Sequence, residues 1–146
     1  MRLNVFASLA LLVCGVVHGQ AIPSAEQVIR REVETGIFDG HDSKVLGNTG
    51  DAAAVLVTKI FAGREFTPAN IDATLTVLRS SFADPSLVRI ADDRQPKTAL
   101  FVLRYLDNSA NDPALKKSIK ETREFILQRY EKYVHDSQAE AHSSAP

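Results

Sequence analysis

The chain has very little sulfur and no tryptophan: one cysteine and one methionine occur in 146 residues. The single cysteine, Cys14, lies in an apolar stretch near the N-terminus, so the chain beyond it has no thiol. This absence excludes an intramolecular disulfide scaffold and a cysteine nucleophile. A chain of this length buries enough surface to form a hydrophobic core without such cross-links.

An excess of charge of one sign is also missing. The 17 lysine and arginine residues nearly balance the 18 aspartate and glutamate residues, and the formal net charge is −1. Nucleic acids and anionic membranes are bound through strongly basic surfaces. The composition therefore gives no support for a nucleic-acid partner, and we expect none.

Common catalytic signatures are absent as well. The chain contains no Gly-x-Ser-x-Gly elbow, P-loop or His-Glu-x-x-His motif. Asp39, His41 and Asp42 cluster in one segment, but their spacing matches neither a calcium loop nor a zinc-binding helix. We expect a polar turn there and a solvated turn at the acidic pair 92–93. The sequence thus predicts no catalytic residue, no cofactor and no metal.

The N-terminus is typical of a secretion signal. Arg2 is followed by an apolar stretch from Leu3 to Val17, and small residues near Gly19 suit cleavage by a signal peptidase. We expect a signal peptide over 1–19. The stretch is shorter than the roughly 18–20 residues of a bilayer-spanning helix, so no stable membrane span is expected after cleavage. The alternatives are a retained membrane anchor and a lipid on Cys14.

The compartment follows from what the chain lacks beyond residue 19. Small secreted domains of eukaryotes usually carry disulfides, and many carry Asn-x-Ser/Thr acceptor sites. Residues 20–146 contain neither cysteine nor such a site. The sequence therefore favours an exported bacterial protein, periplasmic or secreted.

Hydrophobic residues recur at helical spacing through most of the remaining chain, and no segment alternates like a strand. Ser24 with Gln27 predicts a capping box at the first helix, and Thr67-Pro68 predicts the start of the third. Asp51 is expected to cap the second. The predicted helices are 25–35, 52–61, 68–83, 97–107 and 114–133, with one short turn over 42–46.

These helices are expected to form one domain over 20–136. The helices at 52–61 and 97–107 are apolar on nearly all sides, which predicts that both are central and buried. The helix that follows each of them is amphipathic and is expected to shield it. On the last helix, the pairs Lys117/Glu121 and Lys120/Glu124 indicate a solvated face. Residues 137–146 are polar and small, which predicts a disordered tail.

A repeat relates the two halves of the predicted domain. The segments 54–57 and 99–102 are both apolar and lie forty-five positions apart, as do the helix starts at 67–68 and 112–113. A period of about 40–47 residues with two helices per unit is typical of HEAT and armadillo arrays. Residues 46–55 resemble a HEAT repeat, which often carries Leu-Gly and then Gly-Asp before the apolar residues of a helix.

The resemblance covers residues 44–130 and implies an all-α fold, a short HEAT-like stack of antiparallel helix pairs. Such arrays normally contain more than two pairs, because neighbouring pairs cover each other's apolar faces. The segment 86–95 is also long for such an array. A closed five-helix bundle therefore stays open as the alternative fold.

Two functions fit this architecture. The first is an exported non-catalytic interaction module that offers a helical surface to a protein or peptide. The alternative is a small-ligand carrier or minor enzyme with its site between the helices. A shallow groove with exposed leucine or tyrosine favours the first function. A deep apolar cavity between the helix pairs, holding convergent polar groups such as Arg104 or Asp107, favours the second. The candidate partner surface comprises Arg104, Tyr105, Asp107, Tyr130 and Tyr133.

Overall fold

The computed structural model describes residues 22–47, 49–83 and 96–143, and all regular structure in these ranges is helical. The helices are α1 (Ala25–Thr35), α2 (Asp42–Leu46), α3 (Asp51–Ile60), α4 (Pro68–Ser81), α5 (Lys97–Ser109) and α6 (Pro113–Ser143). The predicted all-α class is confirmed, and the short turn over 42–46 is present as α2. The predicted signal peptide and the acidic pair 92–93 lie outside the described residues.

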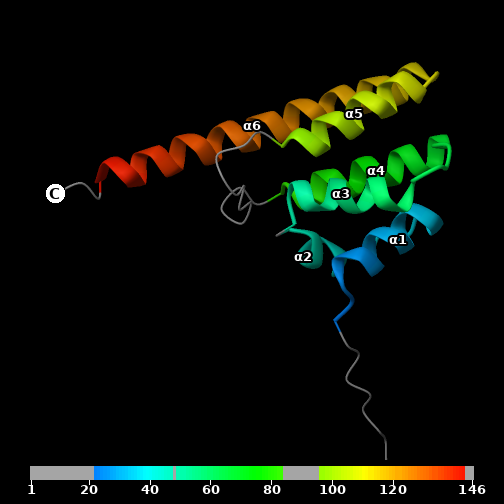
Figure 1. Ribbon diagram of the computed structural model, residues 1–146, viewed down its shortest axis with the longest axis horizontal. Coiled ribbons are helices and arrows are strands. Elements are labelled where there is room, and N and C mark those ends of the chain that lie inside the picture. The colour runs from blue at the N-terminus through cyan, green and yellow to red at the C-terminus, as the bar shows by residue number, and fades with distance from the viewer. Residues whose placement is uncertain (1–21, 48, 84–95, 144–146) are drawn as a thin grey trace, which may run out of the picture.

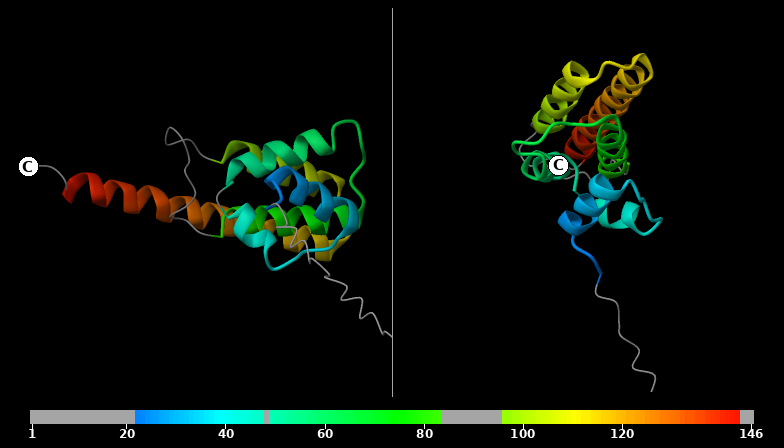
Figure 2. Two further views of the ribbon diagram at one scale, coloured as in Figure 1. Left: turned by 90° about the horizontal axis from the view of Figure 1, so that it is seen from below. Right: turned by 90° about the vertical axis from the view of Figure 1, so that its right-hand side faces the viewer.

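The helices are arranged in three layers (Figure 1). The first layer holds α1 and α2, the second α3 and α4, and the third α5 and α6. Helix α3 packs on α5, α4 packs on α6, and α1 packs on both α3 and α4. The right view of Figure 2 shows the same order of layers, and the left view shows α6 projecting beyond the other helices. The first and third layers therefore form the two outer surfaces.

Local capping fixes the starts of α1 and α4. The Ser24 hydroxyl accepts a hydrogen bond from the Gln27 backbone, and the Gln27 side chain accepts one from the Ser24 backbone, as predicted. Thr67 and Asn70 form the same reciprocal pair at α4. The Asn70 amide also donates to the Val33 carbonyl at 2.8 Å, which ties the start of α4 to the end of α1.

Asp51 is not the cap of its own helix, contrary to the prediction. Gly50 occupies the N-cap position of α3, with a positive φ of 48°. The Asp51 carboxylate instead accepts hydrogen bonds from the backbone amides of Thr98 (3.2 Å) and Ala99 (2.7 Å), in the first turn of α5. These amides have no partner within α5, so Asp51 supplies the missing acceptors across the layers. It therefore holds α3 and α5 in register.

The core between the layers consists mainly of aliphatic side chains, with Phe61 and Phe82 among them. Large residues that are fully buried include Ile29, Leu75, Leu78, Phe82, Leu103, Leu106 and Ile126. A polar contact accompanies the α4–α6 packing: the Arg79 guanidinium donates to the Thr122 hydroxyl at 2.7 Å and to the Ser118 carbonyl at 3.1 Å. Because Thr122 is buried, this contact fixes the position of α6 on α4.

Helix α5 is less buried than its composition predicts. It lies in an outer layer and contacts α3 on one side and α6 on the other. Ala99, Val102, Leu103 and Leu106 are buried, but Phe101 and Tyr105 are exposed. The prediction of two central helices is therefore right for α3, which packs against α1, α4 and α5, and wrong for α5. No further helix pair covers α5 among the described residues.

The last helix is longer than predicted. It extends to Ser143, so 137–143 are helical, whereas a disordered tail was expected over 137–146. The segment contains Ala139, Glu140 and Ala141, which favour helix, and no glycine or proline interrupts it before Pro146. In the described parts of the chain, none of the helices combines the length and the apolar character that crossing a bilayer requires.

Candidate functional site

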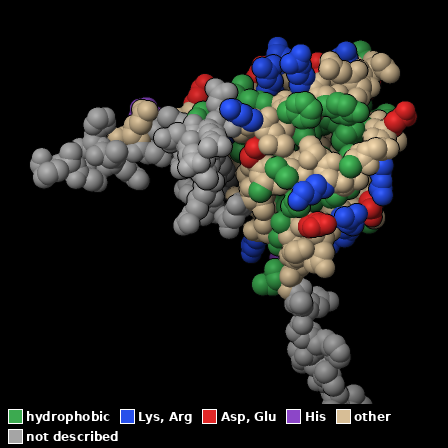
Figure 3. Space-filling view, in the orientation of Figure 1, with side chains coloured by type: hydrophobic (Ala, Val, Ile, Leu, Met, Phe, Trp, Pro, Cys, Tyr) green, Lys and Arg blue, Asp and Glu red, His purple; other side chains and the backbone are tan. Residues whose placement is uncertain are grey.

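Two aromatic side chains lie on the outer surface of α5. Phe101 is 64% exposed and Tyr105 is 48% exposed. They are four residues apart, so both project from the same side of the helix. Figure 3 shows hydrophobic side chains gathered on this face of the molecule, with lysine and arginine side chains along its upper edge. Exposed aromatic side chains grouped in this way are uncommon on a surface that binds nothing.

A groove of about 350 Å³ runs beside these two residues, between α5 and the end of α3. Its apolar wall includes Val57, Phe61, Phe66 and Val102. The Phe61 and Phe66 rings stack with centroids 4.0 Å apart, and Phe66 meets Tyr105 edge to face at 5.7 Å. We call this feature the aromatic groove. Its three packed rings support one another, so its wall is formed before any ligand arrives.

The connection between α3 and α4 brings the phenylalanine rings together. Gly63 adopts a φ of +75° there, a conformation that other residues adopt at a cost. The chain therefore reverses within the few residues between Phe61 and Phe66. Arg64 and Glu65 add charged groups to the lining of the aromatic groove. One Arg64 nitrogen lies 3.9 Å from a Glu34 carboxylate oxygen, which links this connection to α1.

A second groove lies on the other side of Phe101, between α5 and α6. It has a volume of about 910 Å³, and its lining includes Leu100, Leu103, Arg104 and Asp107 from α5. Lysine and arginine side chains of α6 complete it. We call it the basic groove. Phe101 contributes to both grooves and forms the ridge between them.

The structure brings together three of the five residues expected on a partner surface. Tyr105 lines the aromatic groove, and Arg104 and Asp107 line the basic groove. Tyr130 is part of neither lining. Helices α5 and α6 run antiparallel and are joined at residues 110–112. Tyr130 lies so far along α6 that α5, which begins at Lys97, no longer runs beside it. The side chain of Tyr133 lies outside what the structure describes.

Sequence reasoning missed the three phenylalanines of the site. It placed Phe61 and Phe101 on the two helices expected to be buried, and it gave Phe66 no role; Phe61 is buried, whereas Phe101 is exposed. A usable signal was the spacing of Phe101 and Tyr105, which share one helical face, while Val102 and Leu106 occupy the adjacent one. The contribution of Phe66 was not visible in the sequence, because it depends on how the α3–α4 connection folds back.

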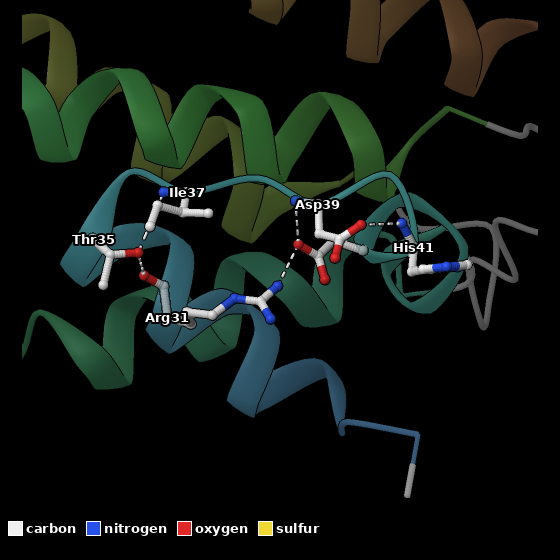
Figure 4. Close-up of polar contacts among 6 residues, drawn as sticks. Arg31, Thr35, Ile37, Asp39 and His41 are labelled. Carbon is white, nitrogen blue, oxygen red and sulfur yellow. Dashed lines mark hydrogen bonds and ion pairs between the residues drawn. The ribbon is translucent and has the colours of Figure 1, made fainter. Parts of the chain in front are cut away.

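A buried carboxyl pair lies away from the grooves, between α1 and α2. Asp42 accepts hydrogen bonds from the Arg31 guanidinium and from the Asp39 backbone amide, the latter at 2.7 Å (Figure 4). Burial alone would raise the pKa of Asp42, but the Asp39 amide and Arg31 outweigh it and hold that pKa below its ordinary value. The Asp39 carboxylate in turn accepts from the His41 backbone at 3.2 Å.

Glu32 is the second member of this pair and is only 2% exposed. No side-chain or backbone N–H donates to its carboxyl oxygens, and the protonated carboxyl can hydrogen-bond to the neighbouring Asp42 carboxylate. Burial, and then the negative charge of Asp42, raise the pKa of Glu32 to about 8. The carboxyl is therefore largely protonated at neutral pH. Because Asp42 is held by Arg31 and the Asp39 backbone, this cluster serves the junction of α1 and α2, and we assign it no catalytic role.

The described residues contain no group of three or more histidine, cysteine, aspartate or glutamate side chains placed to hold a metal ion. The chain matches no protein-family model, no curated protein and no solved structure. The functional conclusion therefore depends on the geometry of α5 and of the two grooves beside it.

Proposed function

We propose that this chain is an exported, non-catalytic helical interaction module that binds a protein or peptide partner at the aromatic groove. The observation that supports this function best is the exposure of Phe101 and Tyr105 beside a groove of preformed aromatic walls. Aromatic side chains supply much of the binding energy of protein interfaces when a partner buries them. A partner side chain in the aromatic groove would pack against Phe101 and Tyr105, which line it.

The geometry favours this function over a small-ligand carrier or minor enzyme. A volume of about 350 Å³ is at the small end of ligand pockets. The aromatic groove is open, since two of its aromatic residues are about half exposed or more. Arg104 and Asp107, which a carrier would direct at its ligand, line the other groove. The polar groups that a carrier would direct at its ligand therefore lie outside the aromatic groove.

The HEAT-like interpretation is part of the proposal. Contacts of α3 with α5 and of α4 with α6 support it, because successive pairs of such an array stack first helix on first and second on second. Its last pair would expose an apolar face that a further repeat covers in longer arrays. In this chain, that face would be offered to the partner. Export through residues 1–19 belongs to the same proposal, and N-terminal sequencing of the mature protein tests it.

The test is affinity capture with the tagged full chain from the cells that naturally make it. We expect the wild type to recover one partner reproducibly and the Phe101→Ala/Tyr105→Ala variant to lose it by about tenfold or more. The control is Ile37→Ala/Phe38→Ala, which removes exposed apolar side chains from the α1–α2 connection instead. Equal recovery by the wild type and the α5 variant, or a co-purifying small molecule without a protein, would contradict the proposal.

A further inference from the structure

The basic groove concentrates positive charge in a chain whose formal net charge is −1. Arg104 of α5 and four α6 residues, Lys116, Lys117, Lys120 and Arg123, are among its lining residues. Against these five cations, the lining contains one acidic residue, Asp107. The composition of the whole chain conceals this local excess. The surface is thus suited to a ligand that carries negative charge.

Ion pairs within the chain leave most of these cations available to bind a negatively charged ligand. Lys117 and Lys120 each approach a glutamate one turn on, at 3.9 Å, but both lysine side chains are nearly 80% exposed. Such exposed pairs contribute little and exchange readily. Arg104, Lys116 and Arg123 form no ion pair with any other residue that the structure describes.

The shape of the groove indicates an extended ligand. Lys116, Lys120 and Arg123 follow one face of α6 over seven positions, which corresponds to about 10 Å along the helix. A small anion would be held by cations that converge, and these are spread along two turns. Leu100, Leu103 and Ile119 also line the groove, so apolar side chains of a ligand find contacts between the charged groups. A volume of about 910 Å³ leaves room for several side chains.

We propose that the basic groove binds an acidic, amphipathic segment of the partner protein, with carboxylates on the α6 cations and apolar side chains on Leu100, Leu103 and Ile119. This inference rests on the proposed function and names the class of partner. Because Phe101 belongs to both grooves, one partner segment that crosses it contacts the aromatic groove and the basic groove together. Apolar contacts then supply most of the affinity, and the cations supply selectivity for acidic sequences.

The experiment is a titration of the full chain with a fluorescent amphipathic peptide of leucine, phenylalanine and glutamate, and with its counterpart in which every glutamate is glutamine. We expect the acidic peptide to bind about tenfold more tightly, an advantage that falls as salt is raised from about 50 to 200 mM. In Lys116→Gln/Arg123→Gln, most of this advantage should be lost, because the lysines that remain in the groove on α6, Lys117 and Lys120, each approach a glutamate. The control Lys44→Gln/Lys59→Gln removes the same charge outside the groove and should keep the advantage.

The outcomes separate this inference from the proposed function. Equal binding of both peptides by the wild type, abolished by Phe101→Ala, would overturn the acidic-partner inference and leave the interaction module intact. Loss of the preference for the acidic peptide in both Lys116→Gln/Arg123→Gln and Lys44→Gln/Lys59→Gln would also overturn the inference. The preference would then depend on the net charge of the protein and not on the basic groove. Binding of anionic phospholipid vesicles in preference to either peptide would assign the groove to a membrane instead. Absence of Phe101-dependent binding to any peptide would count against both proposals.

Discussion

Glu32 shows at the scale of one residue how the fold changes chemistry. Its carboxyl is buried beside the Asp42 carboxylate, which Arg31 keeps ionised. The unfolded chain hydrates Glu32 and returns its pKa to the ordinary value near 4.5. The folded state therefore retains a proton that the unfolded state releases between about pH 4.5 and pH 8.

This difference predicts that the protein loses stability as the pH rises. The free energy of unfolding should fall by an amount of the order of a few kcal/mol from pH 4.5 to above pH 8, because the charged form of Glu32 is poorly tolerated in the folded state. The lowered pKa of Asp42 acts only at more acidic pH and leaves this window unaffected. Urea unfolding at several pH values measures the slope.

Glu32→Gln keeps the size of the side chain and removes its titration. The variant should be more stable than the wild type above pH 8 and nearly independent of pH between 4.5 and 8. Glu34→Gln is the matched control on the same helix, since Glu34 is about half exposed and should leave the slope unchanged. Superimposable profiles of the wild type and Glu32→Gln would show that burial does not perturb this carboxyl.

Asp51 is the residue on which the register of α3 and α5 most depends. Its carboxylate accepts from two backbone amides of α5 that otherwise have no partner. Asp51→Ala should lower the free energy of unfolding by about 0.5–2 kcal/mol, the usual cost of losing a helix cap. Hydrogen exchange at Thr98 and Ala99 should accelerate, because these amides become accessible.

Asp72→Ala is the control for this loss, since Asp72 is exposed on α4 and its carboxylate forms no ion pair or hydrogen bond with any residue that the structure describes. It should change stability by no more than about 0.5 kcal/mol. If Asp51→Ala were as mild as the control, the cap across the layers would be of no consequence.

At the scale of the helix, the sequence predicts hydrogen bonds between neighbouring residues better than hydrogen bonds between distant ones. The starts of α1 and α4 could be predicted, because each cap and its partner lie within three positions. The role of Asp51 could not, because its partners lie nearly fifty positions away. The length of α6 was also underestimated, since polar composition was given more weight than the helix propensity of residues 138–141.

Helix α5 shows how far burial can be predicted from sequence composition. Its composition is that of a buried helix, and four of its apolar residues are buried. Exposure of Phe101 and Tyr105 depends on how many neighbours the fold places around α5, and a sequence period cannot give that number. Arg104, Tyr105 and Asp107 are exposed, and the grooves that they line were not foreseen; their role at a partner surface stays a prediction.

At the scale of the molecule, the three layers have different surroundings. The middle layer is covered on both sides, and α1 with α2 covers one of its faces. The third layer presents α5 and α6 outward, with the two grooves on either side of Phe101. Among the described residues, no further helix covers the outer face of α5, and this face is the surface to which we assign the function.

The most direct measurement is site-specific photo-cross-linking from the full chain in the cells that make it. A benzophenone amino acid placed at Asn108, exposed on α5 one turn after Tyr105, should cross-link one protein reproducibly. The same amino acid at Asp72, exposed on α4, should give no such product. Cross-linking to the same protein from both positions, or to none from either, would contradict the claim that the outer face of α5 is the partner-binding surface.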